Sequence, residues 1–255
     1  MFQKEFDALC QAAQAKRSFL QRNPVGYLMA SMIAGMFISF GSFVSMSIGG
    51  ICTEAGCTVT KFLVSLTFAA ALSLVIMAGS ELFTGNNLVL GAAALRHKMS
   101  WSTVLGMWLV CWIGNLIGSW IMVLIFHFSG VLDNAAIAAF FASTAAAKTA
   151  TAPLKLLLKG VLCNICVCLA VWCSFKLNSE SGKLIMIVWC ILIFMICGFE
   201  HSIANMSIVG VGLLNAGEQT VTLAGYAANL LIVSLGNIIG GLGFVAVPYA
   251  VISKE

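Results

Sequence analysis

The chain has 255 residues, of which 61% are hydrophobic and only 9% are charged. A mean hydropathy of +1.04 excludes an ordinary soluble domain and indicates an all-α polytopic membrane protein, whose first partner is the lipid bilayer. The formal net charge of +4 does not indicate nucleic-acid binding, because the cations are spread over several loops.

Residues 1–26 are predicted to form a cytoplasmic amphipathic helix ahead of the membrane. Its apolar stripe repeats at alternating spacings of four and three residues, as on one face of a helix: Phe2, Phe6, Leu9, Ala13, Lys16 and Leu20. A helix lying in the membrane interface is the simpler interpretation. Because Lys16 falls on the apolar stripe, it is also a candidate gate at the cytoplasmic mouth of a pore.

Six apolar runs follow, and they predict a single transmembrane domain over 27–255. A bilayer requires roughly 20 apolar residues per helix. Four runs are uninterrupted, at about 27–48, 104–128, 156–175 and 223–252. Two more, at about 61–95 and 183–214, contain the polar interruptions "GSELFTGNN" and "CGFEHSIANM".

Six spans place both termini on the same side of the membrane. Lys and Arg are enriched in cytoplasmic loops. Nine of the 13 cations fall on the side of the termini, which we therefore expect to be cytoplasmic: Lys4, Lys16, Arg17, Arg22, Arg96, Lys98, Lys176, Lys183 and Lys254.

The two interruptions are related by an internal repeat. Aligned without a gap, they match Gly79 with Gly198, Glu81 with Glu200, and Asn86 with Asn205. A second pair of motifs, "GNLIG" and "GNIIG", is related by a similar offset in the third and sixth runs. The chain is therefore predicted to be a three-plus-three inverted repeat, with halves at about 27–130 and 150–255 and with helices two and five broken.

Polar breaks inside a bilayer indicate a substrate pathway. Unwound backbone in lipid leaves N–H and C=O groups unpaired at several kcal/mol each, so it is tolerated only inside protein or beside a water-filled cavity. Each helix that restarts after a break directs free N–H groups and a positive dipole end into the gap. The gap between two such ends favours an anion, whereas a simple kink would need no acids, amides or histidine.

The first interruption and the second contribute different chemistry. His201 is the only histidine at the predicted midplane, where it would offer an N–H or a proton to a passing anion; a histidine buried for packing is the alternative. Glu81 and Glu200 would repel anions, so we expect them to accept backbone N–H groups at the breaks or to fix the histidine tautomer. Thr84 is placed to cap the restarting helix and to offer its hydroxyl to the pore.

Amides and one lysine complete the candidate residues. Asn86 and Asn205 are expected to hold the breaks together. Asn115 and Asn237 lie in apolar runs, where they either bond to the breaks or serve helix packing beside their flanking glycines. Lys148 lies in "STAAAKTATAP", which is too apolar for a free loop. We expect this stretch to fold over the outer mouth and to concentrate anions there; a solvated loop lysine is the alternative.

Ten cysteines do not indicate a metal site. The C-x-x-C of Cys163 and Cys166 lies in an apolar run without a nearby histidine, so these thiols are expected to pack as small hydrophobic groups. Cys52 and Cys57 lie in a loop expected to be external, where spacing alone leaves a disulfide open. No metal and no cofactor are expected.

Three segments, "AGSELFTGNN", "KGVLCNICVCLAVW" and "GFEHSIANM", resemble the signature segments of the formate/nitrite transporter family, in the same order. The resemblance extends over essentially the whole chain, which looks most like the bacterial hydrosulfide ion channels of that family. It implies an aquaporin-like protomer with its own pore, assembled as a homopentamer in the bacterial inner membrane. It also implies a central His201, supported by Thr84, Asn205, Lys148 and Asn164.

The resemblance further implies two apolar constrictions beside the histidine. These are formed by Leu72, Leu82 and Phe194 towards the cytoplasm and by Phe68 towards the outside, with Phe83 near them. Stripping water from an anion between such walls is costly. An anion protonated by or near His201 would therefore cross as the neutral acid.

The expected function is a channel or transporter, not an enzyme, for a small monovalent anion or its weak acid. Hydrosulfide is the first candidate substrate, because hydrogen sulfide is a weaker acid than formic or nitrous acid. Formate and nitrite are the alternatives within the family. From another class, an aquaporin-like channel for neutral solutes is the alternative, although the Asn-Pro-Ala breaks of that class are missing.

Overall fold

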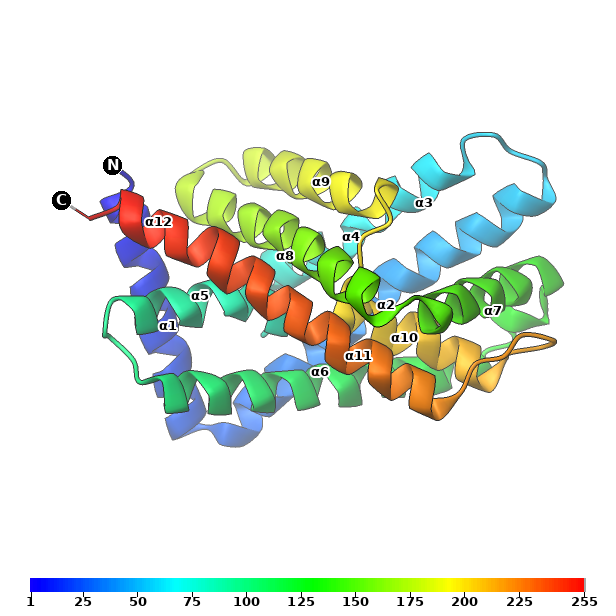
Figure 1. Ribbon diagram of the computed structural model, residues 1–255, viewed down its shortest axis with the longest axis horizontal. Helices are drawn as coiled ribbons and strands as arrows, with labels where there is room; N and C mark the ends of the chain where they lie inside the picture. Colours follow the sequence, from blue (N-terminus) through cyan, green and yellow to red (C-terminus); the bar gives the residue numbers. More distant parts are fainter. Residues whose placement is uncertain (255) are drawn as a thin grey trace.

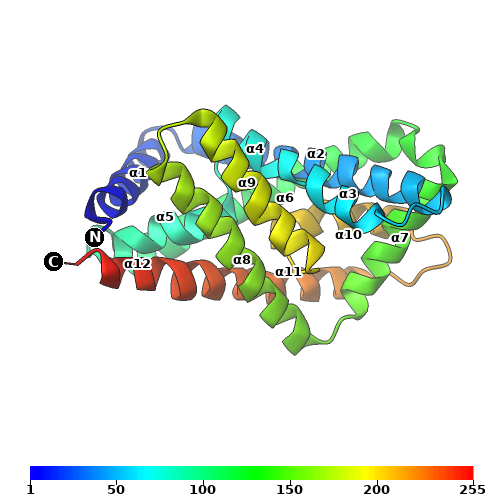
Figure 2. The same cartoon turned by 90° about the horizontal axis from the view of Figure 1, so that it is seen from above.

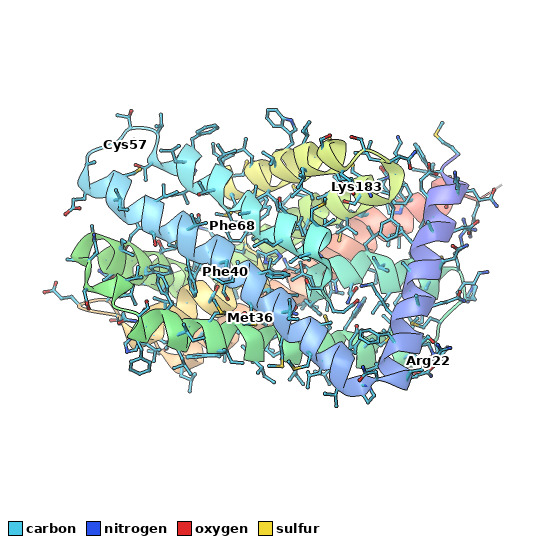
Figure 3. The ribbon with its side chains drawn as sticks, turned by 180° about the vertical axis from the view of Figure 1, so that it is seen from behind. Arg22, Met36, Phe40, Cys57, Phe68 and Lys183 are labelled. Carbon is cyan, nitrogen blue, oxygen red and sulfur yellow. The ribbon has the colours of Figure 1, made fainter. Side chains whose placement is uncertain are left out.

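In the computed structural model, which describes residues 1–254, every regular element is a helix. Most helices run along the long axis of the molecule, and the two termini lie together at one end (Figure 1). α1 (Gln3–Arg22) lies across that end of the bundle (Figures 1 and 3). The α2–α3 loop, with Cys57, lies at the opposite end (Figure 3).

α1 is held against the bundle by the stripe that the sequence predicted to be apolar. Phe6, Leu9 and Ala13 are fully buried, and α1 packs on α2, α5 and α8. Asn23 then caps α2 (Pro24–Glu54), because its side chain accepts the Gly26 N–H at 2.8 Å. α1 therefore packs on protein rather than lying free in a membrane interface.

Five helical runs among residues 1–254 are long and apolar enough to cross a membrane. Three are single helices: α2, α6 (Trp101–Phe128) and α8 (Pro153–Lys176). The run Thr60–Gly79 joins α3 (Thr60–Thr67), α4 (Ala69–Leu74) and the π-helical turn η1 (Val75–Gly79). The run Leu223–Ile252 joins α11 (Leu223–Ile238), the π-helical η3 (Ile239–Ala246) and α12 (Val247–Ile252).

The fifth expected run, 183–214, is divided between two shorter helices. α9 (Glu180–Ile196) has 17 residues and α10 (Ser202–Leu214) has 13. The first interruption similarly separates η1 from α5 (Phe83–Leu95), and Ser80 and Leu82 between them are extended. Both breaks begin at a glycine with positive φ, 81° at Gly79 and 72° at Gly198, a conformation that glycine adopts at little cost.

The small-residue stretch around Lys148 is helical. After the short 3-10 turn η2 (Val131–Asp133), the Asn134 side chain accepts the N–H groups of Ala136 and Ile137 and so caps α7 (Ala135–Ala150). α7 packs on α10 and α2, at the end of the molecule opposite α1 (Figures 1 and 2). Lys148 is therefore positioned by a helix and is not on a free loop.

The two glycine-flanked motifs bring helices into close contact. A Cβ added at Gly118 would collide with the backbone oxygen of Met32, so α6 approaches α2 at that point. A Cβ at Gly240 would collide with the backbone oxygen of Val161 in the same way, where η3 meets α8. Close approach of this kind is the usual role of small residues between membrane helices, and it carries the asparagine of each motif towards a break.

Candidate functional site

Asn115 closes the first break with hydrogen bonds to three backbone groups. Its Oδ1 accepts the N–H of Phe83 at 2.9 Å, at the start of α5. Its Nδ2 donates to the carbonyl oxygens of Glu81 at 2.9 Å and of Ser31 at 2.7 Å. The buried backbone at this break is thus paired through a side chain from α6, as a membrane interior requires.

Asn237 closes the second break with the corresponding bonds. Its Oδ1 accepts the N–H of Ser202 at 3.0 Å, at the start of α10. Its Nδ2 donates to the carbonyl oxygens of Glu200 at 3.1 Å and of Gly160 at 2.8 Å. In both breaks, therefore, an asparagine accepts the backbone N–H that the sequence analysis assigned to a glutamate.

The two glutamate side chains instead bind lysine and asparagine side chains. Glu81 accepts Lys16 Nζ at 2.6 Å and Asn86 Nδ2 at 2.9 Å. Only 22% of the Lys16 side chain and 11% of the Glu81 side chain are exposed. Lys16, which the sequence singled out only by its place on an apolar stripe, thus reaches from α1 to the first break.

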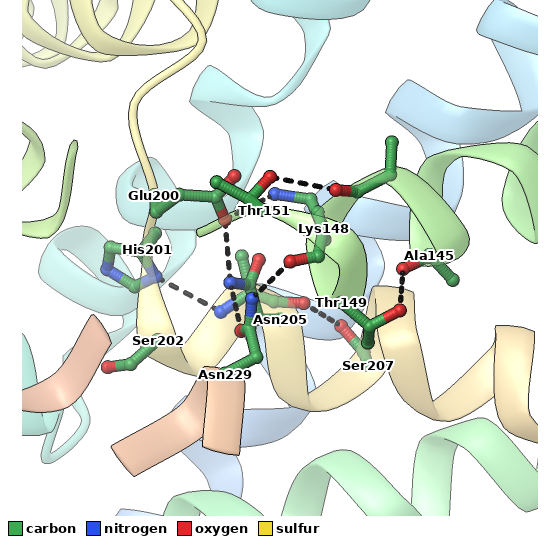
Figure 4. Close-up of polar contacts among 12 residues, drawn as sticks. Ala145, Lys148, Thr149, Thr151, Glu200, His201, Ser202, Asn205, Ser207 and Asn229 are labelled. Carbon is green, nitrogen blue, oxygen red and sulfur yellow. Dashed lines mark hydrogen bonds and ion pairs between the residues drawn. The ribbon is translucent and has the colours of Figure 1, made fainter. Parts of the chain in front are cut away.

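The second break has the same arrangement, with α7 in place of α1 (Figure 4). Glu200 accepts Lys148 Nζ at 2.7 Å and Asn205 Nδ2 at 2.7 Å. Asn229 adds a link, because it accepts from Asn205 at 2.8 Å and donates to the Lys148 carbonyl oxygen at 3.0 Å. The sequence analysis missed Asn229, although an amide in the otherwise apolar α11 was a usable signal.

His201 and Thr84 meet between the two breaks. His201 Nε2 lies 3.0 Å from Thr84 Oγ1, and both residues are buried, with 4% and 0% exposed. The His201 Nδ1 accepts the Ala204 N–H at 3.1 Å and so caps α10 (Figure 4). Because Nδ1 is an acceptor in that bond, the hydrogen of the neutral ring lies on Nε2 and faces Thr84. The histidine tautomer is therefore fixed by a backbone amide and not by a glutamate.

Thr84 does not cap α5, and Asn164 bonds to α5 and to Asn237. α5 has no side-chain cap, so the Thr84 hydroxyl serves the His201 contact instead. Asn164 Nδ2 donates to the carbonyl oxygens of Thr84 at 3.2 Å and Asn237 at 2.7 Å, and to Asn87 Oδ1 at 3.0 Å. From α8, Asn164 thus links α5, which follows the first break, to Asn237, which closes the second break.

Two cavities approach this centre from opposite sides. The first, which we call the α1 cavity, has a volume of about 560 Å³ and is lined among others by Lys16, Leu72, Leu82 and Lys183. The second, the α7 cavity, has a volume of about 130 Å³ and is lined among others by Lys148, Phe194 and His201.

Aromatic side chains pack beside the histidine. The Phe194 ring is nearly parallel to the His201 ring, at 6.1 Å between centroids, and contacts the Phe68 ring edge-on at 5.9 Å. Leu72 and Leu82 line the α1 cavity, and Phe194 lines the α7 cavity. Phe83 is buried and lines neither cavity.

The described residues 1–254 contain no group of three or more His, Cys, Asp or Glu side chains placed to hold a metal ion. All ten cysteines are free thiols, Cys52 and Cys57 included. The chemistry of the site therefore rests on the amides, the histidine, the hydroxyl and the two lysine–glutamate pairs. Together with the apolar helical runs, two polar breaks between two cavities define a multi-pass membrane transport protein.

Comparison with known proteins identifies the family. The formate/nitrite transporter family model matches residues 3–251. The nitrite transporter NirC of Escherichia coli (strain K12) is 35% identical over 245 residues, which are 94% of this chain and 88% of the relative. The solved structure of an FNT family ion channel has a TM-score of 0.91 at 31% identity and covers 98% of this chain and 99% of its own. A pentameric formate channel with formate bound has a TM-score of 0.80 at 28% identity. The match covers 92% of this chain and 99% of that channel's chain.

The chain belongs to the formate/nitrite transporter family. It is accordingly a transport protein and not an enzyme.

Proposed function

We propose that the chain conducts small monovalent anions, in the form of their weak acids, from one cavity to the other past His201. The observation that carries this proposal is the contact between His201 Nε2 and the Thr84 hydroxyl, which is buried between the two cavities. Both groups can donate a hydrogen bond, and no acidic group lies between them. An anion in place of this contact would accept from both.

The two breaks are the centre of a three-plus-three inverted repeat with an aquaporin-like arrangement. In this arrangement Thr60–Gly79 with α5, and α9 with α10, are the broken second and fifth spans. Support comes from the matched bonds of Asn115 and Asn237 and from the matched pairs of Lys16 with Glu81 and Lys148 with Glu200. The neutral-solute alternative is less favoured, because both glutamates at the breaks are neutralised by lysines and the groups left facing the path, His201 and Thr84, can donate to an anion.

The apolar side chains around the centre favour the neutral acid over the bare anion. Leu82 is 4% exposed and Phe194 is 1% exposed, so little water surrounds the path at these points. A charge without a partner pays a large desolvation penalty there, whereas its protonated form does not. The substrate therefore arrives in one cavity as an anion, takes a proton from the water there, crosses the apolar walls as the neutral acid with hydrogen bonds from His201 and Thr84, and releases the proton on the other side.

Hydrosulfide is the first candidate substrate, since hydrogen sulfide is a weak acid and its neutral form is abundant near neutral pH. Nitrite is the second, because the similarity to the nitrite transporter NirC extends over 94% of the chain. Formate is the third, on the similarity to the pentameric formate channel. That channel also supports a homopentameric assembly with one path per protomer.

The protein is proposed to lie in a bacterial inner membrane with both termini in the cytoplasm. The α1 cavity is then the cytoplasmic vestibule and the α7 cavity the outer one. Lys16 lines the α1 cavity and is bound to Glu81, so movement of α1 would open or close that vestibule. Lys16 is therefore proposed as the cytoplasmic gate.

Flux measurements in proteoliposomes test the substrate and the pathway together. Hydrosulfide, nitrite and formate are supplied separately, and both anion uptake and the external pH are followed. We expect uptake with one proton consumed outside for each anion. His127→Asn is the matched control for His201→Asn, because His127 bonds Asn215 outside both cavities. Equal flux of uncharged solutes such as glycerol, without anion uptake, would favour the neutral-solute alternative.

A further inference from the structure

A third cavity, of about 530 Å³, lies between α1 and the connection from α5 to α6. It is separate from the anion path, because it shares no lining residue with the α1 cavity or the α7 cavity. Its polar lining comes from Arg17, His97, Lys98 and Ser100, and its rim includes Trp101. Two of these side chains, Arg17 and Lys98, are cationic.

The positive charge of this cavity is not neutralised within the described chain. The ion pairs of residues 1–254 are Lys16 with Glu81 and Lys148 with Glu200, so Arg17 and Lys98 have no acidic partner. No acidic residue lines the cavity. Asp7, on the same helix as Arg17, is ten residues away, or about 15 Å along the helix axis.

The backbone adds to this positive field. α6 begins at Trp101, and Ser100 caps it by accepting the Thr103 N–H at 3.3 Å. The N–H groups of Trp101 and Ser102 have no partner inside the helix. A helix start of this kind favours an anion, and here it faces a cavity already lined by two unpaired cations.

The position of the cavity indicates which anion fits. α6 is an apolar run of 28 residues that is long enough to cross a membrane, and the cavity lies at its first turn. Trp101, Leu105 and Leu109 are 43%, 57% and 59% exposed and follow one another at intervals of four residues along α6. Tryptophan is enriched at the level of the lipid headgroups, which puts the two exposed leucines at the depth of the acyl chains.

We infer that this cavity binds the phosphate of an anionic phospholipid. Arg17 and Lys98 bind the phosphate oxygens, the start of α6 contributes its free N–H groups, and the acyl chains extend along the exposed side chains of α6. Free inorganic phosphate has the same charged group, but it has no acyl chains to cover the exposed side chains of Trp101, Leu105 and Leu109. Because Arg17 follows Lys16 on α1, an occupied cavity also holds α1 where Lys16 reaches Glu81.

Native mass spectrometry of the purified, delipidated oligomer tests this inference. The protein is titrated with phosphatidylglycerol, with phosphatidylcholine of the same acyl chains, and with inorganic phosphate as competitor. We expect Arg17→Gln and Lys98→Gln each to weaken phosphatidylglycerol binding about fivefold, the change that corresponds to about 1 kcal/mol per cation near a lipid surface. The double variant should bind phosphatidylglycerol about 25-fold more weakly, and Arg17→Lys should retain most of the binding.

Lys4→Gln is the matched control, since Lys4 is an exposed cation of α1 outside the cavity. Arg17 and Lys98 are also exposed, so the oligomer should elute unchanged in every variant. Phosphatidylglycerol binding that is unchanged in the double variant, or equal binding of phosphatidylcholine, would overturn the inference. Displacement of the lipid by an equal concentration of inorganic phosphate would assign the site to a soluble anion and would overturn it as well.

Discussion

Lys16 Nζ lies 2.6 Å from a carboxylate oxygen of Glu81, which ties the N-terminal helix to the first break. A carboxylate beside an anion path would raise the energy of the anion there. The ion pair removes most of that cost, and Asn86 binds the other carboxylate oxygen. The N-terminal helix is therefore part of the electrostatics of the path as well as a cover over one of its ends.

Replacing Lys16 should change both flux and stability. We expect Lys16→Gln to lower anion flux, because Glu81 is left as an uncompensated carboxylate beside the path. The same change leaves Glu81 without its cation, at a cost of about 1–3 kcal/mol, between the values for exposed and fully buried pairs. Flux in proteoliposomes and thermal unfolding of the same samples measure the two effects. Lys4→Gln should change neither, and a Lys16→Gln protein with wild-type flux would count against the gate.

Replacing His201 should alter transport and leave the fold intact. Asparagine is a favoured N-cap, so His201→Asn can still accept the Ala204 N–H and preserve α10. It cannot reproduce the Nε2–H facing Thr84. Loss of a hydrogen bond to a charged group costs about 1.5–3 kcal/mol, so anion flux should fall about tenfold or more. Size-exclusion chromatography should show an unchanged oligomer, and a variant that does not assemble would point to a structural histidine.

Much of the scaffold was predictable, because membrane physics constrains sequence strongly. The apolar runs, the two polar interruptions and the glycine-flanked asparagines are all visible as patterns. The partners of Asn115 and Asn237 were also among the expected alternatives. A buried amide in a membrane helix must bond to something, and the breaks offer unpaired backbone groups.

The partners of the charged residues could not be predicted in the same way. Nothing in the spacing of Lys16 and Glu81, 65 residues apart, predicts that α1 folds across the end of the bundle. Phe194, which the resemblance grouped with Leu72 and Leu82, lines the α7 cavity, whereas the two leucines line the α1 cavity. Which cavity a side chain at the end of α9 lines depends on how the helix is packed, and helical periodicity does not contain that information.

Shortening the apolar side chains beside the histidine should make the path wetter. We expect Leu82→Ala and Phe194→Ala each to raise anion conductance and to weaken discrimination between small and larger anions, because water entering the wider path lowers the desolvation penalty. Leu82 lines the α1 cavity and Phe194 lines the α7 cavity, so the anion conductance of the double variant should exceed that of either single variant. Leu90→Ala, which removes a fully buried side chain of α5 away from both cavities, is the control for a general loss of packing. Equal flux of a larger anion in the wild type and the double variant would contradict the barrier.

Substitutions of Lys148 test whether this lysine acts through a field at the protein surface or through a fixed ion pair. A lysine that only concentrates anions at the mouth acts through a field that salt screens over about 8 Å at physiological ionic strength. Lys148 instead binds Glu200 at 2.7 Å, and the two side chains are only 17% and 6% exposed. Screening of such a pair is weak, so the effect of removing it should persist at high salt.

The decisive variants at this position are Lys148→Glu and Lys148→Arg, compared at low and high salt. Lys148→Glu places a second carboxylate beside Glu200, which should destabilise the second break by about 3–5 kcal/mol and depress flux equally at both ionic strengths. Lys148→Arg keeps the charge and should retain assembly and much of the flux. Lys155→Glu is the control, since Lys155 is an exposed cation at the start of α8 without an ion-pair partner in the described chain. Lys155→Glu should lose a small part of its flux at low salt only. If Lys148→Glu also lost flux only at low salt, Lys148 would act as a surface charge and not as the support of the second break.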